Sequence, residues 1–148
     1  MNRTAIEPAD ALYVGQNCVC LSLQQAARVV GRLFDDALRP LDMTNWQFSL
    51  LMQVAGQGTP TIGELAASLA TDRTTITANL KPLERRGLVE IHKDESDART
   101  RRVIMTKLGA RTMRSAYDIW THVNAGAVKK VGSLNIGQLR EGLSALAS

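Results

Sequence analysis

The sequence has few cysteines, few histidines and no long hydrophobic run, and each shortage excludes a class of protein. The two cysteines among its 148 residues, Cys18 and Cys20, are separated by one residue, a spacing unsuited to an unstrained disulfide, so a disulfide scaffold is excluded. No stretch approaches the roughly 18 consecutive apolar residues of a membrane span, and the N-terminus lacks a basic segment followed by an apolar run. We therefore expect no membrane partner and a cytoplasmic location.

Motifs of catalytic and metal sites are also missing from the sequence. It contains no glycine-rich phosphate loop, no nucleophile elbow and no paired-carboxylate signature, and its histidines are His92 and His122. A Cys-x-Cys pair that lacks a second pair of cysteines or histidines at ligand spacing is not typical of a zinc site. We therefore expect no enzymatic activity, no metal and no cofactor.

The chain has enough apolar residues for one core, and its charge is unevenly distributed. Its length and its 45% hydrophobic content are those of a single folded domain. Residues 73–114 carry eleven Lys and Arg against five Asp and Glu, whereas residues 1–72 carry four against seven. A localised basic segment favours an anion-binding face of the kind that contacts phosphate backbones, although basic clusters are also common on ordinary solvated surfaces.

Apolar spacing and capping residues predict a series of helices. Apolar residues recur every three or four positions over residues 23–41, which predicts a long amphipathic helix ending near Pro40. The helix can extend back to the cysteines, and a short leading helix or loose arm precedes it. Thr44 and Thr61 each stand where an N-cap is expected and are followed three residues later by Gln or Glu, which completes a capping box. Thr71 and Asp72 are both N-cap candidates for the next helix. The third of these helices should stop at Gly87.

The remainder of the chain predicts a hairpin and two more helices. Residues 88–92 and 101–106 are rich in strand-forming residues and enclose a charged run. Thr106 can cap a long helix whose apolar face runs to Val131, and Asn135 can cap a last helix. This order predicts a mainly α fold: a winged helix-turn-helix with a two-stranded β-wing, flanked by N- and C-terminal helices.

The polar face of the helix after Asp72 suits a DNA major groove. Hydroxyl groups and cations can bond to base edges or phosphates, and threonine methyls can contact thymine. The alternative is an ordinary polar helix face, but β-branched residues in a first turn are not chosen for helix propensity. The candidate DNA-contacting residues of this helix are Arg73, Thr74, Thr75, Thr77 and Lys81.

The tip of the hairpin provides a second candidate contact. Arg99 can enter the narrow minor groove, and Asp97 would either orient Arg99 or bond to the turn backbone. Arg101 and Arg102 point to opposite sides of their strand, so one of them, which we take to be Arg101, is expected along the DNA. The alternative is a surface turn with local ion pairs.

The segment from Thr61 to Gly109, with its G-E-L-A, T-T-I-T, L-E-R-R-G-L-V and D-A-R-T-R-R-V elements, resembles the MarR family of bacterial winged-helix transcription regulators. The resemblance extends through the flanking helices. It implies that residues 72–86 form the recognition helix, that Arg99 is the wing-tip arginine, and that a homodimer binds a pseudo-palindromic double-stranded DNA operator. The sequence differs at Ala78, where many members carry a larger basic residue, and at Pro82, which lies inside the recognition helix.

The same interpretation divides the single structural domain into three regions. Residues 1–43 are expected to form an N-terminal dimerisation region, 44–106 the DNA-binding winged helix, and 107–148 the C-terminal dimerisation helices. The apolar faces of the flanking helices exceed what a winged domain of about 60 residues can cover, which independently favours a second copy of the chain. A dimer without an activation domain would repress by occluding a promoter, whereas a winged helix that does not bind DNA would serve as a protein-interaction module.

Two switches remain open at the level of sequence. The resemblance implies a small aromatic or phenolic acid bound between the dimer helices and the winged region, with a candidate cleft of Phe34, Trp46, Tyr117 and Trp120, although aromatic residues on helical stripes are commonly core residues. The second switch is thiol oxidation at Cys20, with Cys18. Cys20 is similar in position to the reactive cysteine of the organic-hydroperoxide-sensing branch, but Gln24 and Phe34 stand where that branch supplies tyrosines, and free cysteines are commonly buried apolar residues.

Overall fold

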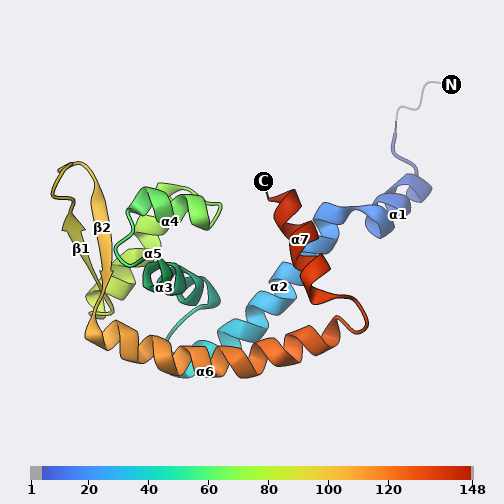
Figure 1. The fold of residues 1–148 in the computed structure, drawn as a ribbon. Coiled ribbons are helices and arrows are strands. Elements are labelled where there is room, and N and C mark those ends of the chain that lie inside the picture. Colours follow the sequence, from blue (N-terminus) through green and yellow to red (C-terminus); the bar gives the residue numbers. More distant parts are fainter. Residues whose placement is uncertain (1–4, 148) are drawn as a thin grey trace.

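The computed structural model describes residues 5–147 and has the predicted order of elements (Figure 1). The fold is mainly α, with a two-stranded antiparallel sheet. No helix in the described part of the chain is both long and apolar enough to cross a bilayer. The elements are α1 (Pro8–Asn17), α2 (Val19–Leu38), the 3-10 helix η1 (Arg39–Leu41), α3 (Asn45–Gln57), α4 (Ile62–Ser68), α5 (Arg73–Arg85), β1 (Val89–Lys93), β2 (Arg101–Met105), α6 (Lys107–Lys130) and α7 (Ile136–Leu146).

The predicted helix starts are confirmed by their capping bonds. Both residues of each predicted capping box, at the starts of α3 and α4, bond reciprocally to the other's backbone. Each of the other caps accepts a backbone N–H from the first turn of its helix, which satisfies a donor that the helix leaves unpaired. The capping residues of α3 to α7 are Thr44, Thr61, Asp72, Thr106 and Asn135.

Small differences from the predicted boundaries have local causes. Helix α2 extends back to the cysteines, the longer of the two predicted extents, and begins at Val19 with Cys18 as its N-cap. Pro40 ends the α-helix as expected, but it lies inside the short η1. Strand β1 starts one residue late because the amide of Leu88 bonds to the carbonyl of Leu83 and completes the end of α5.

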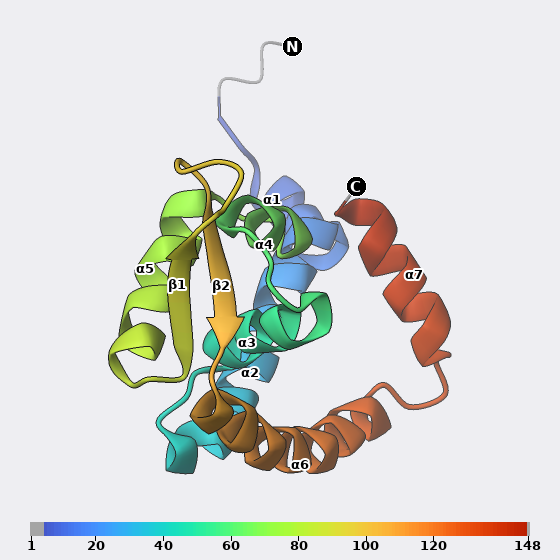
Figure 2. The same cartoon turned by 60° about the vertical axis from the view of Figure 1, so that its left-hand side comes forward.

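The hydrophobic core lies under the winged region. Apolar side chains of α3, α4, α5 and the two strands meet the end of α2 and the first half of α6. Figure 1 shows α6 running along the base of these elements with α2 beside it, and Figure 2 shows the β-strands next to α5. One face of α5 is therefore held inward and the opposite face is left to solvent. The fully buried side chains include Leu38, Leu50, Leu51, Val54, Leu65, Ile76, Leu80, Leu83 and Val103.

The terminal helices leave much of their apolar surface exposed. Neither α1 nor α7 contains a buried residue, and both lie on the side of the molecule away from the wing (Figure 1). Contiguous exposed apolar surface on a folded chain marks an interaction site. The exposed apolar residues of α1, α2 and α7 are Leu12, Tyr13, Val14, Val19, Val29, Val30, Leu33, Ile136, Leu143 and Leu146.

Two close backbone contacts fix the wing, which we define as β1, β2 and the connecting residues 94–100. The amide of Val103 donates to the carbonyl of Pro60 at 2.9 Å, which joins β2 to the connection between α3 and α4. At the other end, a Cβ added to Gly109 would lie 2.0 Å from the carbonyl oxygen of Leu88. Glycine is therefore required where α6 passes the start of the wing.

Candidate nucleic-acid interface

Helix α5 presents a polar and cationic face on the side opposite its buried residues. Ile76, Leu80 and Leu83 are fully buried, so the helix cannot rotate without exposing them. The opposite face exposes Arg73, Thr74, Ala78 and Lys81, and a shallow surface hollow of about 280 Å³ runs between them and Thr77.

The threonines of α5 do not all have free hydroxyl groups. The hydroxyl of Thr75 donates to Oδ2 of Asp72 at 2.8 Å, and that of Thr77 donates to the carbonyl of Arg73 at 2.8 Å. The bonds that Asp72 accepts, first from the Thr75 amide and then from its hydroxyl, lower the pKa of the Asp72 carboxyl. Thr75 therefore acts in the helix cap, and Thr77 keeps its oxygen lone pairs and its methyl group for a partner.

Pro82 does not end helix α5. Helix α5 continues through Pro82 to Arg85, and the chain then turns at Gly87, where φ is 69°. A positive φ of this size is the conformation that glycine adopts at helix ends. Pro82 itself comes after Lys81, the last of the exposed residues that line the hollow on α5.

The wing tip is organised by Asp97. Its Oδ1 accepts the amide of Arg99 at 2.9 Å and its Oδ2 accepts the hydroxyl of Thr100 at 2.8 Å. These bonds lower the pKa of the Asp97 carboxyl, the Arg99 amide contributing most. Asp97 was expected either to orient the Arg99 side chain or to bond to the turn backbone. In the structure it bonds to the turn, and the Arg99 side chain is exposed.

Arg102 anchors the wing and was not among the predicted site residues. Its Nε donates to the Asp94 carboxylate and a terminal nitrogen donates to the carbonyl of Thr59 at 2.9 Å. The Asp94 side chain is 8% exposed, and the hydroxyl of Ser96, followed by Arg102, holds the pKa of its carboxyl well below the ordinary value. Strand alternation indicated that Arg101 and Arg102 face opposite sides, and the structure shows that Arg102 is committed to the fold.

The predicted residues of α5 and of the wing meet around one hollow of about 250 Å³, which we call the arginine hollow. It brings together the start of α4, the first turns of α5 and the wing. Four of the lining residues were predicted to contact DNA. The other four, Thr61, Ile62, Gly63 and Thr100, were not, although Thr61 was identified as a helix cap and Gly63 and Thr100 lie in the motifs of the family resemblance. The full lining is Thr61, Ile62, Gly63, Arg73, Thr77, Arg99, Thr100 and Arg101.

Three of the four candidate effector-cleft aromatics are buried or half-buried, whereas Tyr117 is 39% exposed. Phe34 is buried, and Trp46 and Trp120 are half-buried against the core. The Trp120 ring stacks on Phe48 and Tyr117, with centroid distances of 6.4 and 5.7 Å. The alternative that aromatic residues on helical stripes are core residues therefore describes Phe34, Trp46 and Trp120, and it does not describe Tyr117.

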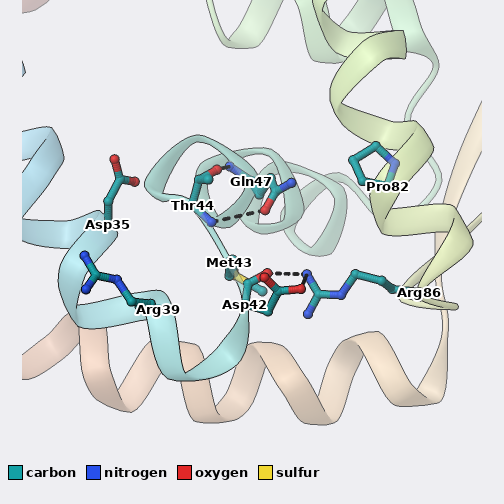
Figure 3. A pocket seen from close by; sticks show the side chains of 8 residues that line it. All are labelled: Asp35, Arg39, Asp42, Met43, Thr44, Gln47, Pro82 and Arg86. Atoms are coloured by element: carbon teal, nitrogen blue, oxygen red, sulfur yellow. Dashed lines mark hydrogen bonds and ion pairs between the residues drawn. The ribbon is translucent and has the colours of Figure 1, made fainter.

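A different hollow lies between the end of α2 and the winged region (Figure 3). We call it the junction hollow; its volume is about 420 Å³, and none of the four aromatics lines it. A terminal nitrogen of Arg86, at the end of α5, donates to the carbonyl of Leu41 at 2.8 Å, and the other donates to the carbonyl of Asp42. Its lining is Asp35, Arg39, Asp42, Met43, Thr44, Gln47, Pro82 and Arg86.

The cysteines lie at the start of α2. The half-buried Cys18 Sγ accepts the Leu21 amide at 3.4 Å, and the exposed Cys20 Sγ accepts Nε2 of Gln24 at 3.3 Å. Gln24 thus contacts Cys20, as its position in the sequence suggested. Within residues 5–147 no group of three or more His, Cys, Asp or Glu side chains is arranged to hold a metal ion.

Comparisons with known proteins agree with this architecture. Residues 41–100 match the MarR family. The chain is 28% identical over 104 residues to the organic hydroperoxide resistance transcriptional regulator of Bacillus subtilis (strain 168), covering 70% of this chain and 71% of the relative. It is 35% identical to the M. tuberculosis transcriptional regulator MosR solved in complex with DNA, with a TM-score of 0.79 and coverage of 88% and 94%. The fold also matches a mutant MarR from E. coli complexed with operator DNA, at 23% identity, a TM-score of 0.81 and coverage of 91% and 97%.

Proposed function

The chain belongs to the MarR family of transcriptional regulators, which are not enzymes, and from this membership we propose that it is a homodimeric repressor that binds a pseudo-palindromic operator in double-stranded DNA. The observation that carries the proposal is the arginine hollow, where the cations of α5 and of the wing meet on one exposed face. Two relatives, MosR and E. coli MarR, have been solved with DNA, which supports the same use of this face here.

The proposed contacts follow from the shapes of the two exposed elements. Helix α5 would lie in the major groove with Arg73, Thr74 and Lys81 toward the DNA, and the wing would place Arg99 in the neighbouring minor groove. Thr77 and Arg101 would lie between these two contacts. Thr75 and Asp97 would act indirectly, by holding the cap of α5 and the turn of the wing.

A second copy of the chain would cover the exposed apolar surface of the terminal helices. Residues 1–43 and 107–148 would form the dimerisation regions and residues 44–106 the DNA-binding region. Val30 and Leu33 on α2, and Ile136 and Leu143 on α7, are each between 37% and 42% exposed, an exposure that burial against a partner would remove. Two-fold symmetry would then set two α5 helices roughly 34 Å apart, one turn of DNA.

Selection of bound fragments from the host genome by the purified protein tests the proposal. We expect recovery of a pseudo-palindromic sequence, bound at least ~10³-fold more tightly than random duplex and less tightly as salt concentration rises. A protein-interaction module would recover no preferred sequence, and that outcome would refute the proposal.

Release by a small phenolic acid would act through the junction hollow. This hollow joins the end of α2 to the end of α5 through Arg86, so a ligand there would contact both the dimer helices and the recognition helix. Met43 and Pro82 would contact an aromatic ring and Arg39 a carboxylate (Figure 3). We expect phenolic acids to weaken operator binding by wild type and not by Arg39→Gln; the same loss in both proteins would place the ligand elsewhere, including at the four aromatics.

Thiol oxidation is the second candidate switch, favoured by the exposed Cys20 thiol and by similarity to a hydroperoxide-resistance regulator. The sulfur would take the terminal oxygen of an organic hydroperoxide, giving a sulfenic acid on Cys20 and releasing an alcohol. Hydroperoxide should then weaken operator binding by wild type and by Cys18→Ser, but not by Cys20→Ser. Unchanged binding by all three proteins would exclude this switch.

A further inference from the structure

Three guanidinium groups from separate segments line the arginine hollow. Arg73 comes from the first turn of α5, Arg99 from the wing tip and Arg101 from the start of β2. None of the described residues that line the hollow is acidic. Three cations that share one hollow without a lining carboxylate attract an anion, which would offset their mutual repulsion.

The acidic groups nearest in sequence, Asp72, Glu64 and Asp97, are already engaged. Asp72 caps α5 by accepting the amide and the hydroxyl of Thr75. The Glu64 carboxylate accepts the Thr61 amide at 2.7 Å, and the pKa of Glu64 is lowered mainly by that bond. Asp97 is held by the Arg99 amide and the Thr100 hydroxyl. These carboxylates do not line the hollow, and they leave its interior to the arginines.

Gly63 makes the room that Arg73 occupies. A Cβ added to Gly63 would lie 3.1 Å from a terminal nitrogen of Arg73 and 3.5 Å from its Cζ and Nε. The Arg73 guanidinium therefore rests against the α-carbon of Gly63, at the start of α4. An alanine at this position would push the guanidinium away without touching the core.

Other polar groups that line the hollow keep hydrogen-bond donors available for a ligand. The Thr61 hydroxyl oxygen accepts the Glu64 amide at 3.1 Å, which leaves its proton for a partner. Arg101 donates from one terminal nitrogen to the carbonyl of Ala98 at 2.8 Å. That bond fixes the direction of the side chain and leaves its remaining N–H groups for an acceptor.

We propose that the arginine hollow is a seat for one phosphate of the DNA backbone, held by Arg73 and Arg101 together. This inference rests on the proposed function. The sugar-phosphate backbone separates the major groove from the adjacent minor groove, so a protein with α5 in one and Arg99 in the other must cross that backbone at a phosphate. The arginine hollow lies between α5 and the wing, at this crossing point.

The seat gives Arg73 and Arg101 a positioning role. They fix the register of α5 along the duplex and carry no sequence preference of their own. Because both bind one phosphate, removal of either arginine should weaken the same contact. Lys81 shares the neighbouring hollow on α5 with Arg73 but does not line the arginine hollow, so it would contact a different phosphate.

The test combines arginine variants with operators in which a single phosphate is replaced by an uncharged methylphosphonate. For wild type we expect one backbone position in each half-site whose neutralisation lowers affinity at least ~10-fold and reduces the salt slope by about one unit. Arg73→Gln and Arg101→Gln should each bind the unmodified operator less tightly than wild type does. Neutralising that one phosphate should lower their affinity little further. For Lys81→Gln, neutralising the same phosphate should lower affinity by the same factor as for wild type.

Gly63→Ala tests the seat without removing a charge. We expect it to fold with unchanged dimerisation, to bind the operator several-fold more weakly and to lose little further affinity at the same methylphosphonate. Gly56→Ala is the matched control, because a Cβ at Gly56 meets no atom within 4 Å, and its binding should equal that of wild type.

The outcomes separate this inference from the proposed function. Tight operator binding with the full methylphosphonate loss in Arg73→Gln and Arg101→Gln would overturn the phosphate seat and leave the DNA-binding function standing. Failure to prefer any operator would overturn both. Inorganic phosphate, titrated while the arginine side-chain NMR signals are followed, should bind far more weakly than the operator; saturation at micromolar phosphate would assign the hollow to a free anion.

Discussion

Arg102 donates to the carboxylate of Asp94 within the wing and to the carbonyl of Thr59, 2.9 Å away, in the connection between α3 and α4. The pair therefore ties the wing to the helical core at a point close to the arginine hollow. Together with the bond from Val103 to Pro60, it sets the position of Arg99 relative to α5. These bonds hold the wing against the connection between α3 and α4.

Replacement of Arg102 should loosen the wing. Arg102→Gln removes the charged bond to Asp94 and the contact to Thr59, so we expect several-fold faster amide hydrogen exchange over residues 94–101 and a small loss in the free energy of unfolding. The control is Arg114→Gln, which breaks the exposed Arg114–Asp118 pair on α6 and should leave wing exchange unchanged. Equal exchange in the wings of both variants would show that Arg102 does not anchor the wing.

The pH dependence of stability should contain a contribution from Asp94. Its pKa is lowered in the folded chain from the ordinary 3.8, so the unfolded chain takes up the proton first as pH falls. The stabilising contribution is therefore complete well above pH 3.8 and is lost as pH falls below that value toward the folded pKa. Urea unfolding should find Asp94→Asn less stable than wild type at pH 7, with the difference narrowing below pH 3.8; a carboxyl NMR titration midpoint for Asp94 at or above 3.8 would contradict this.

The sequence predicted the helices well because each begins at a local signal. Asp72 and Thr106 are caps whose effect depends on residues three positions away, and Gly87 ends α5 by its own backbone conformation. Contacts between distant segments left no such local signal. The bond from Arg102 to Thr59 joins elements that are adjacent only after folding, and so does the contact between the Arg73 side chain and Gly63.

The same limit explains why the candidate site in the structure differs in detail from the site that the sequence predicts. The polar face of α5 and the wing arginines could be located from spacing and from charge. The engagement of the Thr75 hydroxyl by Asp72 could not, because a threonine three residues after an Asp N-cap is equally able to turn its hydroxyl outward. Whether an aromatic residue lines a cleft or packs inside also depends on its neighbours, as Trp120 shows by stacking on Phe48.

Gly109 should tolerate no side chain. A Cβ there would lie 2.0 Å from the Leu88 carbonyl oxygen, a backbone atom that cannot move aside easily, so Gly109→Ala should lower the free energy of unfolding by about 2 kcal/mol or more. In the same helix a Cβ at Gly126 meets no atom within 4 Å, and Gly126→Ala should raise stability by about 0.5–1 kcal/mol. Thermal unfolding of both variants checks the pair, and a stable Gly109→Ala would mean that α6 can shift away from the wing.

Arg99 should contribute to operator binding without supporting the fold. Its side chain is exposed at the wing tip, where Asp97 holds its backbone. Arg99→Ala should therefore cost about 1–3 kcal/mol in operator binding at fixed salt and leave the melting temperature and the dimer unchanged. Fluorescence anisotropy with a labelled operator measures the loss, and an affinity equal to that of wild type would remove the wing from the interface.

Sedimentation equilibrium of the protein with a genome-selected fragment, and with a scrambled duplex of the same composition, decides whether two copies of this chain together recognise a DNA sequence. We expect two chains per selected fragment, a free protein that is dimeric at micromolar concentration, and at least ~10³-fold weaker association with the scrambled duplex. A monomeric chain that associates equally with both duplexes would refute both the dimer and the operator.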